Sequence, residues 1–255
     1  MNKILRFIIV DIVKNKIVIF YTILLCAFSF SIFSLEDSSS KALLTLLNII
    51  LLTVPLVSIL FSTIYIYNSA EFIELLVSQP IERKKVWMGL FFGLVSSLSF
   101  AYFVGVGLPI LIFADFTVAA MMIVVGILVS VVFTSLACLC AVLARDKAKG
   151  IGISIMLWLY FALLFDALVL FIIYQFSDYP IEKMLIGLSA LSPIDVARIV
   201  ILLNTDAAAM MGYTGAVFKN YLGTSFGFMM AFLVLFIWAF VPFYLSLRIF
   251  KKKDL

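Results

Sequence analysis

The chain has 255 residues, of which 65% are apolar and 13% are charged, and its formal net charge is +4. A soluble core has no use for so large an apolar fraction, so the composition predicts a protein that crosses a membrane several times. The absence of histidine excludes Ser-His-Asp and Cys-His catalysis and removes the commonest metal ligand. We expect no cofactor and no bound metal.

The first predicted element, residues 1–16, is an amphipathic helix. Ile4, Phe7, Ile8 and Ile12 fall on one face, and lysine and arginine occupy the other. Such a helix lies along the membrane surface and leads into the first span.

Six long apolar runs follow, and each can cross a hydrocarbon core of about 30 Å as a helix of about 20 residues. They occupy residues 17–35, 42–68, 87–113, 117–143, 151–176 and 223–247. Lysines precede the first run, as in a signal peptide, but Glu36 and Asp37 follow it where a small-residue cleavage site would be needed. We therefore expect a retained first span, a single domain over residues 1–255, and an all-α fold with six transmembrane helices.

The basic residues predict the orientation of these spans. Of the 18 lysines and arginines, all fall on one side of the membrane except Lys41, Lys183, Arg198 and Lys219, and none lies within a run. The positive-inside rule makes the richer side cytoplasmic and places both termini there. This asymmetry accounts for the net charge, so we expect no nucleic-acid partner.

The cytoplasmic segment 71–85, between the second and third spans, carries a cluster of charges in a chain where charge is scarce. Phe72, Leu75 and Leu76 have the i, i+3, i+4 spacing of one helical face, and Glu71 and Glu74 lie on the other. Pro80 is predicted to end the helix. A short amphipathic helix between two spans is typical of a contact with a protein outside the membrane, and the alternative is a charged turn that only fixes topology.

The third outer segment, residues 177–222, is far longer than most connections and is predicted to have its own structure. Ser192, Pro193 and Asp195 form a helix start, and a second short helix is predicted at 207–211. We expect an external helical platform near the membrane surface. The alternative is a lid that plugs the end of the bundle.

Few side chains within the membrane offer chemistry. Asp166 is the one acid deep in a span, and we expect it to be protonated and hydrogen-bonded because no span contains a basic partner; a proton or cation path is the alternative. Cys138 and Cys140 point in opposing directions on a helix, and adjacent Met210 and Met211 cannot easily share one ion. We expect packing or partner contacts at these positions rather than metal binding.

The segment Glu74-Leu-Leu-Val-Ser-Gln-Pro-Ile-Glu-Arg-Lys-Lys85 resembles the coupling segment of ABC-2 type permeases, in which an LLS-x-P-(I/V)-x-R pattern precedes the third span. Outside the membrane, Leu191-Ser-Pro-Ile-Asp195, Arg198 and 206–218 resemble the external segment of NosY-like permeases. These belong to the ABC system that matures copper-containing nitrous oxide reductase. The resemblance implies a permease fold without catalytic residues, in the inner membrane of a bacterium.

The resemblance also implies partners and contact residues. The partners are a dimer of cytoplasmic ATPase subunits, a second copy of the chain, and a periplasmic β-helical protein. The implied ATPase contacts are Glu71, Phe72, Glu74, Leu75, Leu76, Pro80, Arg83 and Lys84. The implied external contacts are Asp195, Arg198, Ile201, Asp206, Met210 and Met211. An ABC-2 exporter of a lipid, a drug or a polysaccharide is the alternative function, and the dimer could also move no solute and act only on the periplasmic protein.

The predicted orientation can be tested by thiol labelling. A Glu82→Cys variant is expected to stay unlabelled when an impermeant thiol reagent is added to intact cells and to react after lysis, because residue 82 faces the cytoplasm. A Lys41→Cys variant, on the predicted outer side, is expected to react in intact cells. Labelling of position 82 from outside would contradict the topology.

Overall fold

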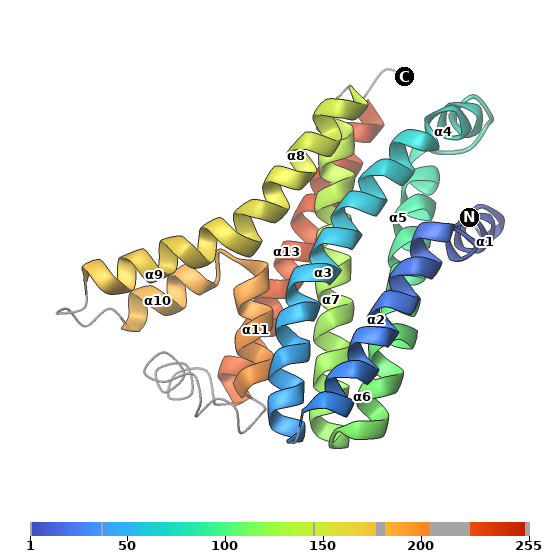
Figure 1. Cartoon of the computed structure of the whole chain (residues 1–255). Coiled ribbons are helices and arrows are strands. Elements are labelled where there is room, and N and C mark those ends of the chain that lie inside the picture. Colours follow the sequence, from blue (N-terminus) through green and yellow to red (C-terminus); the bar gives the residue numbers. More distant parts are fainter. Residues whose placement is uncertain (1, 37, 145, 177–181, 204–224, 253–255) are drawn as a thin grey trace.

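The computed structural model describes residues 2–36, 38–144, 146–176, 182–203 and 225–252, and these residues form a helical bundle (Figure 1). Its first half contains α1 (Asn2–Val13), α2 (Lys16–Leu35), α3 (Ser39–Asn68), α4 (Ala70–Val77), α5 (Arg83–Tyr102), η1 (Phe103–Gly107) and α6 (Leu108–Phe113). Its second half contains α7 (Phe116–Leu143), α8 (Lys147–Leu159), η2 (Tyr160–Leu164), α9 (Phe165–Gln175), α10 (Glu182–Ser189), α11 (Pro193–Leu203) and α13 (Ser225–Lys252).

Among the described residues, six helical stretches are long and apolar enough to cross a membrane, which confirms the six predicted spans. They are Lys16–Leu35, Lys41–Asn68, Arg83–Phe113, Phe116–Leu143, Lys147–Gln175 and Gly227–Lys252. A helix satisfies its backbone polar groups internally, which a bilayer core requires. The short helix α4 and the C-terminal end of α13 lie toward the same end of the bundle (Figure 1). We call this the α4 end.

Two of the spans contain a π-helical turn, in which one extra residue is accommodated within the helix. The turn η1 ends at Gly107, two residues before Pro109, which has no backbone N–H to continue a regular hydrogen-bond ladder. Gly105 in η1 also lets α2 pass closely, because a Cβ atom there would lie 2.9 Å from the carbonyl oxygen of Thr22. The second turn, η2, divides the fifth span into α8 and α9.

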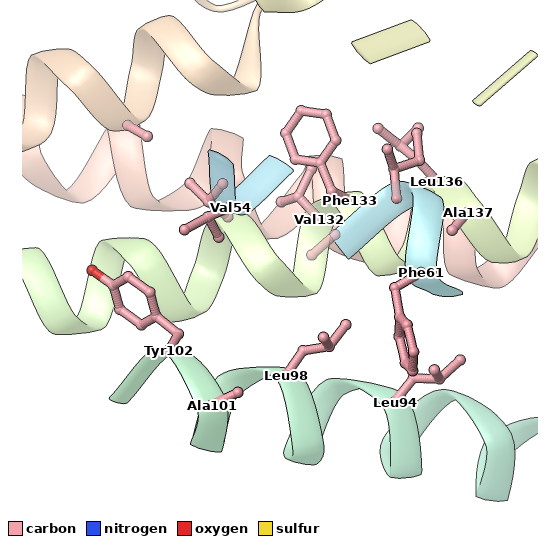
Figure 2. Close-up of a cluster of buried hydrophobic side chains, with 14 of the residues drawn as sticks. Val54, Phe61, Leu94, Leu98, Ala101, Tyr102, Val132, Phe133, Leu136 and Ala137 are labelled. Atoms are coloured by element: carbon pink, nitrogen blue, oxygen red, sulfur yellow. The ribbon is translucent and has the colours of Figure 1, made fainter. Parts of the chain in front are cut away.

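Helix α7 is the centre of the bundle, since α3 and α13 pack along its length and α5, α8 and α11 also touch it. Figure 2 shows the apolar side chains that α3, α5 and α7 contribute to this core. Its most deeply buried members are 0% exposed and include Val54, Leu94, Val132 and Phe133. Close side-chain packing is what holds membrane helices together, because lipid gives no hydrophobic drive for their association.

Tryptophan N–H groups join helices that are distant in sequence. Trp87 Nε1 donates to Ser246 Oγ at 3.1 Å, which ties the start of α5 to the end of α13. Trp158 Nε1 donates to the Leu52 carbonyl at 3.1 Å and ties α8 to α3. Trp238 Nε1 donates to the Ala190 carbonyl at 3.1 Å and ties α13 to the α10–α11 junction.

Helix α11 differs from its predicted place on an external surface. It packs against α3, α7 and α13, and Ile194, Ala197 and Val200 are at most 1% exposed. It lies in the half of the bundle away from α4 (Figure 1). For the described part of this segment, the structure therefore favours the alternative of a plug in the bundle. The second predicted helix, at 207–211, lies outside the described residues.

The tight contact between α5 and α7 gives a test of the core. A Cβ atom on Gly126 would lie 2.2 Å from the hydroxyl of Tyr102, which is 0% exposed and donates to the Met122 carbonyl at 2.9 Å. Gly126→Ala is expected to displace this ring and to destabilise the protein by about 1–3 kcal/mol, as measured by thermal unfolding in detergent.

The matched control is Gly152→Ala in α8, where an added Cβ would meet nothing within 4 Å. It is expected to leave stability unchanged or to raise it slightly, since alanine is the better helix former. Equal melting temperatures for the two variants would contradict the described packing.

Candidate coupling site

The helix α4 follows α3 after a single residue, Ser69, which ends one helix and begins the next. Its N–H donates to the Tyr65 carbonyl at 2.9 Å, and its carbonyl accepts from Ile73 N at 2.9 Å. Eight residues are too few for a stable isolated helix. The helix α4 is therefore stabilised by packing on the rest of the chain, which buries Ile73 and Leu76 to 4% and 9% exposure.

Helix α1 provides part of the surface against which α4 packs. The rings of Phe7 and Phe72 lie with their centroids 5.4 Å apart. Tyr65, near the end of α3, donates a hydrogen bond to Asp11 Oδ2 at 2.9 Å. The N-terminal helix, the last turn of α3 and α4 are thus joined into one unit at the α4 end.

The contact of α1 with α5 explains where α1 sits. Ile8 and Ile12 are 0% exposed. A Cβ atom on Gly93 would lie 2.5 Å from Cγ2 of Ile8, so a glycine is needed at this crossing. Residues in α1 were not predicted to belong to the coupling site. The isoleucine spacing and the small residue at Gly93 were the available signals, but neither identifies its partner.

The three apolar residues of the predicted docking face of α4 differ in how far they are exposed. Leu75 is 65% exposed, whereas Phe72 is half-buried on Phe7 and Leu76 is buried. The interpretation that these three side chains together are open to a partner is therefore corrected. Leu75 is the one of the three that α4 presents to the outside.

The helix α4 and the start of α5 also carry charged side chains. Glu71, Glu74 and Lys84 are exposed and Arg83 is half-buried. Helix α4 ends at Val77, before the exposed Pro80, and the turn returns directly to α5. In this turn Glu82 and Lys85 form an ion pair at 3.1 Å with both side chains more than half exposed, so it adds little stability. An exposed leucine with acidic and basic neighbours is the chemistry of a protein-docking surface.

Some of the predicted external contact residues are buried in the structure, and others lie outside the described residues. Asp195 and Ile201 are 8% and 2% exposed and face their own chain, so they are not open to a partner in this structure. Asp206, Met210 and Met211 lie outside the described residues.

Arg198 corrects the prediction for Asp166. Its Nη1 lies 3.3 and 3.1 Å from the two carboxylate oxygens of Asp166, and its Nη2 lies 3.1 Å from Oδ2. Asp166 thus has a basic partner, which comes from α11 rather than from another span, so the expectation that it lacks a basic partner is wrong. Arg198 Nη1 also lies 3.4 Å from Asp195 Oδ1.

Asp195 lies outside the six spans. It shares the guanidinium of Arg198 with Asp166. Burial, and next the negative charge of Asp166, raise the pKa of Asp195 above its ordinary value, and Arg198 opposes this shift. The closest contacts of Arg198 with Asp166 are shorter, at 3.1 Å, than its contact with Asp195, at 3.4 Å.

Six spans with a short, partly exposed helix between the second and third define a membrane permease of the kind that a partner drives from outside the bilayer. The family model described as ABC-2 family transporter protein matches residues 71–255 and so begins within α4. The chain belongs to this family, and it is a multi-pass, non-catalytic permease subunit of an ABC transporter. Membership implies a separate ATPase partner.

The chain is also similar to a protein of Pseudomonas aeruginosa named "Probable ABC transporter permease protein NosY". The two are 29% identical over 170 residues. The match covers 62% of each, so the chain spans less than two thirds of the relative's length.

The two neighbouring leucines of α4 give a test of the site that needs no partner. Leu76→Asp is expected to lower the melting temperature of the permease, at a cost of about 3 kcal/mol, because it places a carboxylate in a packed position. Leu75→Asp is expected to change the free energy of unfolding by less than about 0.5 kcal/mol and so to leave the melting temperature nearly unchanged. A fall as large for Leu75→Asp would mean that Leu75 is covered by its own chain.

Proposed function

We propose that the chain couples ATP hydrolysis by a cytoplasmic ATPase to work on the far side of the bacterial inner membrane. In this proposal it acts as a homodimer in the assembly of the copper site of nitrous oxide reductase. The exposed Leu75 at the point where the family match begins is the observation that carries the coupling role. The likeness to NosY supports the copper-assembly role.

The α4 surface has the features that such coupling needs. Leu75 offers an apolar anchor, and Glu71, Glu74 and Lys84 can make charged contacts around it. Phe72 and Leu76 are held by α1 and by the bundle, so α4 is anchored where the ATPase would push. A force on α4 would therefore move the ends of α3 and α5 rather than bend α4 alone.

The work on the far side is proposed to be remodelling of a periplasmic β-helical partner, with or without movement of a solute. The core between α3, α5 and α7 is filled by apolar side chains such as Phe61, Leu98 and Leu136 (Figure 2). A filled apolar core favours transmission of motion over a hydrophilic pore within one copy. Export of a lipid or other cargo between two copies is the alternative function.

The proposal can be tested by deletion and complementation in the source organism. Deletion of the gene is expected to yield nitrous oxide reductase depleted in copper, measured by metal analysis of the purified enzyme. The original gene is expected to restore the copper and Leu75→Asp is not, because a carboxylate replaces the apolar anchor. The Leu75→Asp permease is also expected to lose co-purification with the ATPase.

Leu35→Asp is the matched control, because Leu35 is 81% exposed at the end of α2 away from α4. It is expected to retain ATPase binding. A normally copper-loaded reductase in the deletion strain would contradict the copper-assembly role and favour the alternative of export. Unchanged ATPase binding by Leu75→Asp would contradict the docking role of α4.

A further inference from the structure

The fifth span changes character at its π-helical turn. Its first part, α8, is fixed to α3 by the hydrogen bonds of Thr63 with Ser154 at 2.8 Å and of Trp158 with the Leu52 carbonyl at 3.1 Å. Phe161 in η2 and Phe165 just after it are 5% and 2% exposed. Up to this point the span belongs to the bundle.

Beyond Phe165 the span stands away from the bundle (Figure 1). Along α9, Leu170, Phe171 and Tyr174 are 66%, 64% and 82% exposed. These apolar side chains can face lipid at no cost, so they do not fix the direction of α9. A polar contact with another helix can set the angle at which α9 leaves η2.

The ion pair of Asp166 with Arg198 is such a contact. Asp166 lies in the first turn of α9, and Arg198 reaches it from α11 with two guanidinium nitrogens. Both oxygens of the carboxylate are engaged, and a forked contact of this kind restricts direction as well as distance. The side chain of Arg198 is 28% exposed and that of Asp166 is 33% exposed, so water screens the pair only in part.

The other end of this contact is firmly placed. Helix α11 is wedged among α3, α7 and α13, and Trp238 of α13 bonds to the Ala190 carbonyl near its start. Arg198 therefore extends from an element fixed in the bundle to one that projects from it. The length of the Arg198 side chain and the contacts of its two guanidinium nitrogens restrict where the first turn of α9 can lie.

We propose that Arg198 is a positioning residue that fixes the bend of the fifth span at η2 and makes α9 and α11 move together. π-helical turns are a recognised cause of bends within helices and often mark functional positions. Where the proposed coupling function holds, and this second step rests on it, a movement of the bundle begun at the α4 end carries α11 with it, and Arg198 passes that movement to α9.

The bend can be measured in the full chain without the ATPase. Spin labels are attached to Tyr174→Cys in α9 and Phe116→Cys at the start of α7, which are 82% and 76% exposed, in a Cys26→Ala background. The permease is reconstituted in lipid nanodiscs and diluted with unlabelled chains, so that pulsed electron resonance reads distances within one copy. Arg198→Gln is expected to broaden or shift the distance distribution by more than its original width.

Two further variants separate the ion pair from general damage to the fold. Exchange of the charges, Asp166→Arg with Arg198→Asp, is expected to restore the original narrow distribution. Asp195→Asn is the matched control, because it alters the neighbouring carboxyl on α11 and leaves the Asp166–Arg198 contact in place. It is expected to keep the original distribution.

An unchanged distribution in Arg198→Gln would overturn the proposal, and so would a broadened one in Asp195→Asn or in the charge exchange. None of these outcomes bears on ATPase docking, which is read separately by co-purification.

The transmission step is tested in the permease–ATPase complex with the same labels at position 174 in α9 and position 116 in α7. ATP is expected to shift the distance between these two labels in the original chain and not in Arg198→Gln. An equal shift in both, or no shift in either, would overturn the transmission step.

Discussion

A bilayer provides no water to pair with a buried polar group, and the rest of the structure depends on this constraint. Some hydroxyl side chains in the spans bond to the carbonyl of the preceding turn of their own helix, as Thr22 does to Val18 and Ser29 to Leu25, each at 2.8 Å. Tryptophan N–H groups find acceptors on neighbouring helices. The same constraint makes an unpaired polar side chain in the fifth span costly, and Asp166 is matched by the guanidinium of Arg198.

The six spans could be predicted from the sequence because length and apolar composition decide them without knowledge of any contact. Arg198 could not be paired with Asp166 in the same way. Helix α11 has eleven residues, too few to cross a bilayer, so its apolar composition predicted a surface element. Its insertion among α3, α7 and α13 is a matter of how the spans pack, which periodicity does not report.

The coupling site shows the same limit at the level of single side chains. Helical spacing correctly places Phe72, Leu75 and Leu76 close together on α4. Which of them remains open depends in part on the position of α1, since Phe72 packs against Phe7. A pattern within one helix gives its apolar arc, and only the neighbouring helices decide which part of that arc is left for a partner.

The contrast between the core and the fifth span indicates where the molecule can change shape. In the core, Tyr102 fills the space above Gly126 so closely that α5 and α7 cannot slide without breaking a buried hydrogen bond. Such packed contacts transmit displacement as a rigid body. The fifth span has this close packing only as far as η2, and beyond it a charged contact replaces packing. A change of angle there costs no cavity in the core, so a permease with this fold can keep its bundle intact while its far side rearranges.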